Sequence, residues 1–210
     1  MQRATELTLR GLFATAVFLL LGAPLIAQNQ NWDVYGGLQY ARFHPMAFDE
    51  PVEPFVNGPA WNLAASRAVG SWLRIKADLS RTALYDTEGD LQDHTPVSLL
   101  TYAFGPVFDL RRLASRSGGF ERPGSKVLFG EVLFGGYRQV TKYTELAGRP
   151  ITGVALTMGG GMDVSLSRRI AIRAFECDWI AFLTDNAVYV HPVAGPKANL
   201  RLSAGLIFRF

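Results

Sequence analysis

The sequence predicts an all-β protein: an eight-stranded antiparallel up-and-down β-barrel that follows a cleavable signal peptide. Three observations lead to this fold class. Two segments alternate cleanly between apolar and polar residues, further segments of similar length recur along the chain, and the first residues have the composition of an export signal. Alternation with a period of two is typical of strands that have one apolar face.

The N-terminal residues have the composition of a targeting signal rather than of a folded element. Arg3 and Arg10 are basic, the run Gly11–Ala23 is apolar, and Ala27 places a small residue before Gln28. This order is typical of a secretory signal peptide, and the apolar run is shorter than the roughly 20 residues of a spanning helix. We expect a signal peptide at residues 1–27 and one barrel domain at residues 28–210, with a signal anchor as the alternative.

The composition narrows the class of protein. The formal net charge is only +3, and a nucleic-acid binder would concentrate basic residues on one face. The single cysteine, Cys177, excludes an internal disulfide. The mean hydropathy is positive at +0.11, yet no internal stretch resembles a membrane helix. Transmembrane β-strands reconcile these facts, because only every second residue must be apolar.

Two segments show the alternation most clearly. Ser71–Arg81 places Leu73, Ile75, Ala77 and Leu79 on one face and Arg74, Lys76, Asp78 and Ser80 on the other. Leu200–Phe210 places Leu200, Leu202, Ala204, Leu206, Phe208 and Phe210 on one face and Arg201, Ser203, Gly205, Ile207 and Arg209 on the other. Because backbone groups cannot stay unpaired in lipid, such strands cross a membrane only in a closed barrel.

Six noisier segments complete an even number of strands, as small bacterial barrels require. They are Asp33–Phe43, Ala60–Ala68, Val97–Asp109, Val127–Val140, Ile151–Leu166 and Ile170–Phe182. Aromatic residues lie mostly near the ends of the expected strands: Trp32, Tyr35, Tyr40, Trp61, Trp72, Tyr102, Tyr137 and Trp179. They predict aromatic girdles at the two membrane interfaces, and ordinary core aromatics are the alternative.

Two of these segments do not alternate strictly. In Ile170–Phe182, Arg173 has the opposite parity from Glu176 and Asp178, which favours a β-bulge at Ala174–Phe175. In Val127–Val140, an inward Glu131 brings apolar neighbours inward with it. There we expect either a bulge or a charge at a rim.

The connections follow from a periplasmic N-terminus. The expected outer loops are residues 44–59, 82–96, 141–150 and 183–199, and the expected short turns are Val69–Gly70 and Ser167–Arg168. A third turn, Arg111–Ser125, is long and basic, so it is either a solvated loop or a contact for anionic material. Function on such scaffolds concentrates in loops, so an unidentified ligand would bind at the outer ones.

The expected lumen charges are Arg74, Lys76, Asp78, Glu131, Arg173, Glu176, Asp178, Arg201 and Arg209. Side chains about fill the interior of an eight-stranded barrel, and a lone buried ion is costly. We therefore expect a salt-bridged plug in which Asp78 and Glu131 each pair with an interior Arg or Lys. A narrow polar conduit is the alternative.

No motif in the sequence points to catalysis. The run Gly159–Gly161 lacks the Gly-Lys-Ser/Thr of a phosphate-binding loop, and glycines in a strand more often mark a close backbone approach. His44, His94 and His191 have no metal-site spacing. We expect no enzymatic activity, no cofactor and no metal.

The order of several segments resembles a known family. AWNLAAS followed by WLRIKADLS, then FGEVLFGG, MGGGMDVSLSRRIAIR and the ending NLRLSAGLIFRF, is similar to the eight-stranded barrels of the outer-membrane protein A transmembrane-domain superfamily. The resemblance implies that the barrel-assembly machinery reads the last strand at Phe210, with Phe208, Leu206 and Ala204 on the same face. Departures are Val107, where relatives often carry a basic residue, the long turn, and the lack of a peptidoglycan-binding domain.

These observations predict an integral protein of the bacterial outer membrane with a structural or surface-interaction role. Its expected partners are outer-membrane lipids and the barrel-assembly machinery, and not nucleic acid. The alternatives are a narrow porin for small polar solutes, a lipid-modifying outer-membrane enzyme and a soluble lipocalin-like binder.

Overall fold

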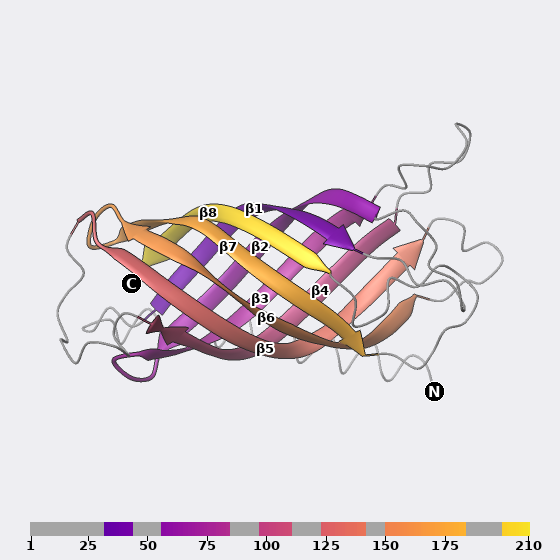
Figure 1. The fold of residues 1–210 in the computed structure, drawn as a ribbon, viewed down its shortest axis with the longest axis horizontal. Helices are drawn as coiled ribbons and strands as arrows, with labels where there is room; N and C mark the ends of the chain where they lie inside the picture. The colour runs from indigo at the N-terminus through magenta and orange to yellow at the C-terminus, as the bar shows by residue number, and fades with distance from the viewer. Residues whose placement is uncertain (1–31, 44–55, 85–96, 111–122, 142–149, 184–198) are drawn as a thin grey trace. The chain divides into compact units, whose positions relative to one another are not determined.

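The computed structural model describes residues 32–43, 56–84, 97–110, 123–141, 150–183 and 199–210. These residues form a closed barrel of eight antiparallel strands, each paired with the next along the chain (Figure 1). The strands are β1 (Trp32–Phe43), β2 (Val56–Ala68), β3 (Leu73–Leu84), β4 (Val97–Asp109), β5 (Lys126–Thr141), β6 (Ile151–Ser165), β7 (Ile170–Leu183) and β8 (Leu200–Arg209). The predicted fold class is confirmed.

The barrel closes where the first strand meets the last. The β1–β8 ladder runs from Asp33 opposite Arg209 to Arg42 opposite Leu200. The predicted signal peptide lies outside the described residues, as do most residues of the predicted outer loops and the three histidines. Among the described residues, no helix is long and apolar enough to span a membrane.

Most strand boundaries match the prediction, but two strands are longer toward the loops. β2 begins at Val56 rather than Ala60, and β3 ends at Leu84 rather than Arg81. Val56 pairs with Phe43, and Leu84 pairs with Val97. The neighbouring strand therefore extends the ladder past the point where the local apolar pattern ends, even through Pro59, which has no N–H to donate.

The barrel has two unlike ends, which we call the turn end and the loop end. The turn end, at the left of Figure 1, carries the β2–β3 and β6–β7 turns. In these turns Val69 N donates to Leu73 O and Leu166 N donates to Ile170 O, both at 3.0 Å. Of the long basic turn, residues 111–122 lie outside the described residues, and Gly124 leads into β5 with a φ of 83°.

Alternation gives the barrel wall an apolar exterior. Large exposed apolar side chains occur on every strand except β3, whose outward apolar residues are mostly half-buried; Leu38 has 78%, Phe104 60% and Phe134 60% relative exposure. In β8, Leu202, Leu206 and Phe208 are exposed, and Phe210 after it is exposed as well. The exterior therefore suits an apolar solvent better than water.

Two of the predicted girdle aromatics lie inside instead. Tyr35 and Tyr137 are buried, whereas Tyr40, Trp61, Trp72 and Tyr102 are exposed. The parity of each strand decides this outcome, because Tyr35 shares the inward face of β1 with Gln39 and Tyr137 shares that of β5 with Gln139. These two rings belong to the core.

The two irregular strands behave differently. In β7 the register shifts between Arg173 and Glu176, and Ala174 and Phe175 both point outward, so the predicted bulge is confirmed. In β5 the pairing with β6 is continuous, and Phe129, Glu131 and Leu133 are all buried. The expected bulge or rim charge is absent from β5, because the lumen accepts apolar side chains beside the charge.

Candidate functional site: the charged lumen

Charged side chains from six strands meet inside the barrel. We call this set the ion network: Asp33, Arg74, Lys76, Asp78, Glu131, Asp163, Arg173, Glu176, Asp178, Arg201 and Arg209. Each member lies on the inward parity of its strand, and the β7 bulge is what brings Arg173 and Glu176 to the same face. All the expected lumen charges are members of this set.

Lys76 is the centre of the network. Its Nζ lies 3.0 Å from both carboxylate oxygens of Glu131, 2.6 Å from Glu176 Oε1 and 3.5 Å from Asp78 Oδ2. The side chain is almost fully buried, as are those of its partners. One ammonium therefore pairs with carboxylates from β3, β5 and β7, which offsets part of the high cost of burying each charge alone.

Arg201 joins β8 to β3 and β7. Its Nε donates to Asp178 Oδ2 at 2.9 Å, and its Nη1 donates to Asp78 Oδ1 at 3.2 Å and to Ser80 Oγ at 3.1 Å. The predicted pairing of Asp78 and Glu131 with interior cations is thus present. The fork of an arginine suits this position, because it can bind partners on two sides at once.

Arg173 extends the network toward the turn end. Its guanidinium donates to both oxygens of Asp163, at 2.9 and 3.3 Å, and to Glu176 Oε1 at 3.2 Å. The guanidinium carbon also lies 4.6 Å from the ring centroid of Tyr35 and 4.4 Å from that of Phe129. Two inward aromatic rings therefore hold the cation by cation–π contacts in addition to its ion pairs.

The network becomes half-buried at the turn end itself. Arg74 Nη1 donates to Asp33 Oδ2 at 2.7 Å, and Arg209 Nε lies 3.8 Å from the other oxygen of Asp33. The side chains of Arg74 and Asp33 retain 16% and 18% exposure. This end of the lumen is therefore in contact with solvent, unlike the centre.

An apolar cluster fills the lumen at the loop end. This loop-end cluster consists of Ala41, Phe43, Leu99, Tyr137, Ala155, Ile180 and Phe182. The Phe182 ring lies 4.7 Å from the ring of Tyr137 and 5.7 Å from that of Phe43. Among the described residues, the lumen therefore carries apolar side chains at the loop end and the ion network toward the turn end.

The glycine run of β6 makes room for the network. Gly159 and Gly161 have inward parity, opposite Asp178 and Glu176 of β7. A Cβ on Gly159 would lie 2.0 Å from Asp178 Oδ1, and one on Gly161 would lie 2.9 Å from the Phe129 ring. The glycines thus allow a close approach of neighbouring strands and side chains, as predicted, rather than forming a phosphate-binding loop.

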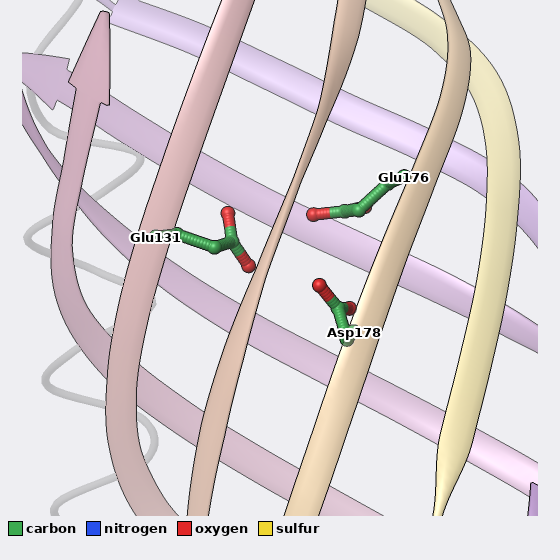
Figure 2. Close-up of side chains that lie close together, drawn as sticks. All are labelled: Glu131, Glu176 and Asp178. Atoms are coloured by element: carbon green, nitrogen blue, oxygen red, sulfur yellow. The ribbon is translucent and has the colours of Figure 1, made fainter. Parts of the chain in front are cut away.

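Three carboxylates in the lumen lie close enough together to be a candidate metal site. Glu131, Glu176 and Asp178 each place an oxygen within 4.8 Å of the others, and Figure 2 shows them directed toward a common point. Hard divalent cations favour such oxygen ligands. However, Lys76 pairs with the two glutamates and Arg201 with the aspartate, so a metal ion would have to displace cations that the chain itself supplies.

Sequence reasoning missed four contributors to this site: Asp33, Asp163, Tyr35 and Phe129. Parity alone could have found Asp163, which is in phase with Thr157 and Ser165 on β6. Tyr35 is predicted in a girdle instead, and Phe129 is one of the apolar neighbours that share the inward parity of Glu131 on β5. The predicted assembly residues Ala204, Leu206, Phe208 and Phe210 are all exposed.

Comparisons with known proteins identify the fold. No protein-family model and no curated protein sequence matches the chain. Among solved structures, the chain is similar to Neisserial surface protein A, with a TM-score of 0.58 and 14% identity over 85% of this chain and 97% of that one. It is also similar to the outer membrane protein OprG from Pseudomonas aeruginosa, with a TM-score of 0.52 and 9% identity over 86% of this chain and 96% of that one. The chain therefore has the fold of eight-stranded outer-membrane barrels.

Proposed function

We propose that the chain is an integral outer-membrane barrel with a plugged lumen and a structural or surface-interaction role. The observation that carries this proposal is the burial of the ion network around Lys76, whose side chain is 3% exposed. A conducting lumen would hydrate these ions, whereas here each of them is paired with an opposite charge inside the barrel. The apolar exterior with Leu38, Phe104 and Phe134 exposed supports insertion in a bilayer.

The orientation in the membrane follows from the same proposal. The turn end would face the periplasm and the loop end the exterior, since barrels of this kind have short periplasmic turns and longer outer loops. A surface role would then reside in the connections at the loop end, which lie outside the described residues. The exposed face Ala204, Leu206 and Phe208 with Phe210 would serve assembly of the barrel.

Planar-bilayer recording tests the plugged lumen. Folded wild-type protein is expected to insert without a stable open conductance. A gel shift between unheated and boiled samples of the same preparation checks that the barrel is folded. Stable ohmic conductance from a preparation that shows this shift would contradict the plug and favour the narrow porin.

We also propose that the barrel is not an enzyme. Among the described residues, the buried hydroxyls Ser80 and Thr101 bond to each other, and Ser203 donates to Glu176, so they are engaged within the lumen. The lipid A mass profile of cells with and without the protein should be identical. A changed profile would reinstate the lipid-modifying alternative.

A further inference from the structure

Charged side chains are sorted between the two faces of the barrel wall. Among the described residues, every Asp and Glu is buried or half-buried. Every exposed charged side chain in the same ranges is basic: Arg42, Arg67, Arg81, Lys126, Arg138, Arg168 and Arg169. Among the described residues, the exposed charge on the outer surface is therefore positive, which attracts anions.

Two of these arginines lie in one row on the outer face, near the loop end. Arg81 of β3 is directly opposite Leu100 of β4, and Leu100 is directly opposite Arg138 of β5. The two arginine Cα atoms are thus two strand spacings apart, about 10 Å. Long side chains from both sides can converge on one phosphate between them, and guanidinium groups match phosphate geometry.

Neither arginine is occupied by a carboxylate among the described residues. Arg81 Nε donates to Ser98 Oγ at 3.0 Å, on the same outer face of β4. This bond directs the Arg81 guanidinium over β4, toward the Arg138 side of the row. The hydroxyl is neutral, so within the described residues no carboxylate cancels the positive charge of the pair.

An apolar track begins directly below this pair. On the outer face of β4, Leu100 is followed by Tyr102 and then Phe104, which are 48% and 60% exposed. Phe104 is directly opposite Phe134 of β5, also 60% exposed. The Tyr102 ring covers Gly136, where a Cβ would lie 2.6 Å from its hydroxyl. Phosphate-binding groups above an apolar track match a lipid, with its headgroup and acyl chains.

We infer that Arg81 and Arg138 form a binding site for the phosphate headgroup of a membrane lipid, whose acyl chains lie over Tyr102, Phe104 and Phe134. The inference rests on the proposed function, since these residues meet lipid only if the barrel is inserted. Free phosphate shares the anionic chemistry, but it would make no use of the apolar track. The occupant is therefore a phosphorylated lipid.

Native mass spectrometry of the detergent-solubilised full chain tests this site, with phosphatidic acid and phosphatidylcholine of equal chain length as probes. Wild-type protein is expected to bind phosphatidic acid more tightly than phosphatidylcholine. The double variant Arg81→Gln/Arg138→Gln should lose roughly tenfold or more of its affinity for phosphatidic acid. Its affinity for phosphatidylcholine should be unchanged.

A matched control removes the same charge at the turn end. Arg168→Gln/Arg169→Gln should keep the wild-type affinity for phosphatidic acid. Equal losses in both double variants would overturn the inference, because they would show attraction to overall charge only. Competition by inorganic phosphate as effective as that by phosphatidic acid would overturn the lipid as occupant.

The gel shift separates failure of this site from failure of the barrel. A folded barrel that inserts into phosphatidylcholine vesicles but does not prefer phosphatidic acid would refute the lipid site alone. A chain that shows no shift and stays outside the vesicles would refute the proposed function, and the lipid site with it.

Discussion

The two halves of the barrel interior differ in chemistry, with the ion network toward the turn end and the apolar loop-end cluster at the other end. Glu176 in the ion network is 0% exposed, and Phe43 in the loop-end cluster is 1% exposed. Both halves are formed by inward side chains, and β1, β5, β6 and β7 contribute to both. The two halves differ in what the side chains around each buried residue must provide.

The loop-end cluster requires only volume, whereas the ion network requires particular partners. Any side chain of suitable size and shape can replace an apolar one at modest cost. A charge in the network is stable only while its counter-charge is present, and the counter-charge comes from a different strand. The ion network is therefore the more specific half, and substitutions should reveal that difference.

Removal of the central cation should have the largest effect. Lys76→Met leaves Glu131 and Glu176 without their shared ammonium. Breaking one partner of a buried pair costs about 3–5 kcal/mol, and here one residue serves more than one carboxylate. Urea unfolding of the reconstituted barrel, followed by the gel shift, measures the loss.

A second substitution shows whether charge, rather than shape, causes that loss. Adding Glu131→Gln to Lys76→Met removes one unpaired carboxylate and should recover part of the stability. If Lys76→Met unfolds at the same urea concentration as the wild type, the ion network is not buried as described.

Loss of volume in the loop-end cluster should have a smaller effect. Phe182→Ala removes a ring that contacts Tyr137 and Phe43, and such truncations cost about 3–5 kcal/mol, which is the cost of breaking one buried ion pair, whereas Lys76→Met breaks more than one. Phe182→Leu should cost less because it keeps most of the volume. Unfolding measured at several salt concentrations should show the same loss throughout, since no charge is involved; a strong salt dependence would argue against this view.

The smallest expected effect is at the glycine run beside the network. Gly159→Ala places a methyl group against the Asp178 carboxylate, and overpacking of this kind costs about 1–3 kcal/mol. Gly36→Ala is the matched control, since no atom lies within 4 Å of its Cβ position. The same unfolding measurement should separate the two variants, and equal stability would mean that Gly159 is not in close contact.

Much of the architecture follows from local sequence, as β8 illustrates. Its alternation assigns Arg201 inward and Phe208 outward before any partner is known. The bulge at Ala174–Phe175 was also foreseeable, because Arg173 and Glu176 could not otherwise share a face. A period-two pattern describes one strand at a time, so it predicts well whether each side chain of that strand points into the lumen or outward.

The contacts within the lumen were not foreseeable in the same way. Lys76 and Glu176 are 100 residues apart in the chain and meet only because the barrel closes. The parity of β1 turns Tyr35 inward, but its contact with Arg173 of β7 exists only because the barrel closes. A pattern within one strand carries no information on which side chain lies across the lumen.

The sequence by itself determined the strands, their faces and the inward direction of most charges, because alternation is a local property of the backbone. Only the tertiary structure decided that Lys76 holds Glu131 and Glu176 together and that Arg81 and Arg138 flank one residue of β4. Both results depend on the register between strands. That register is a property of paired strands, so the pattern within a single segment does not specify it.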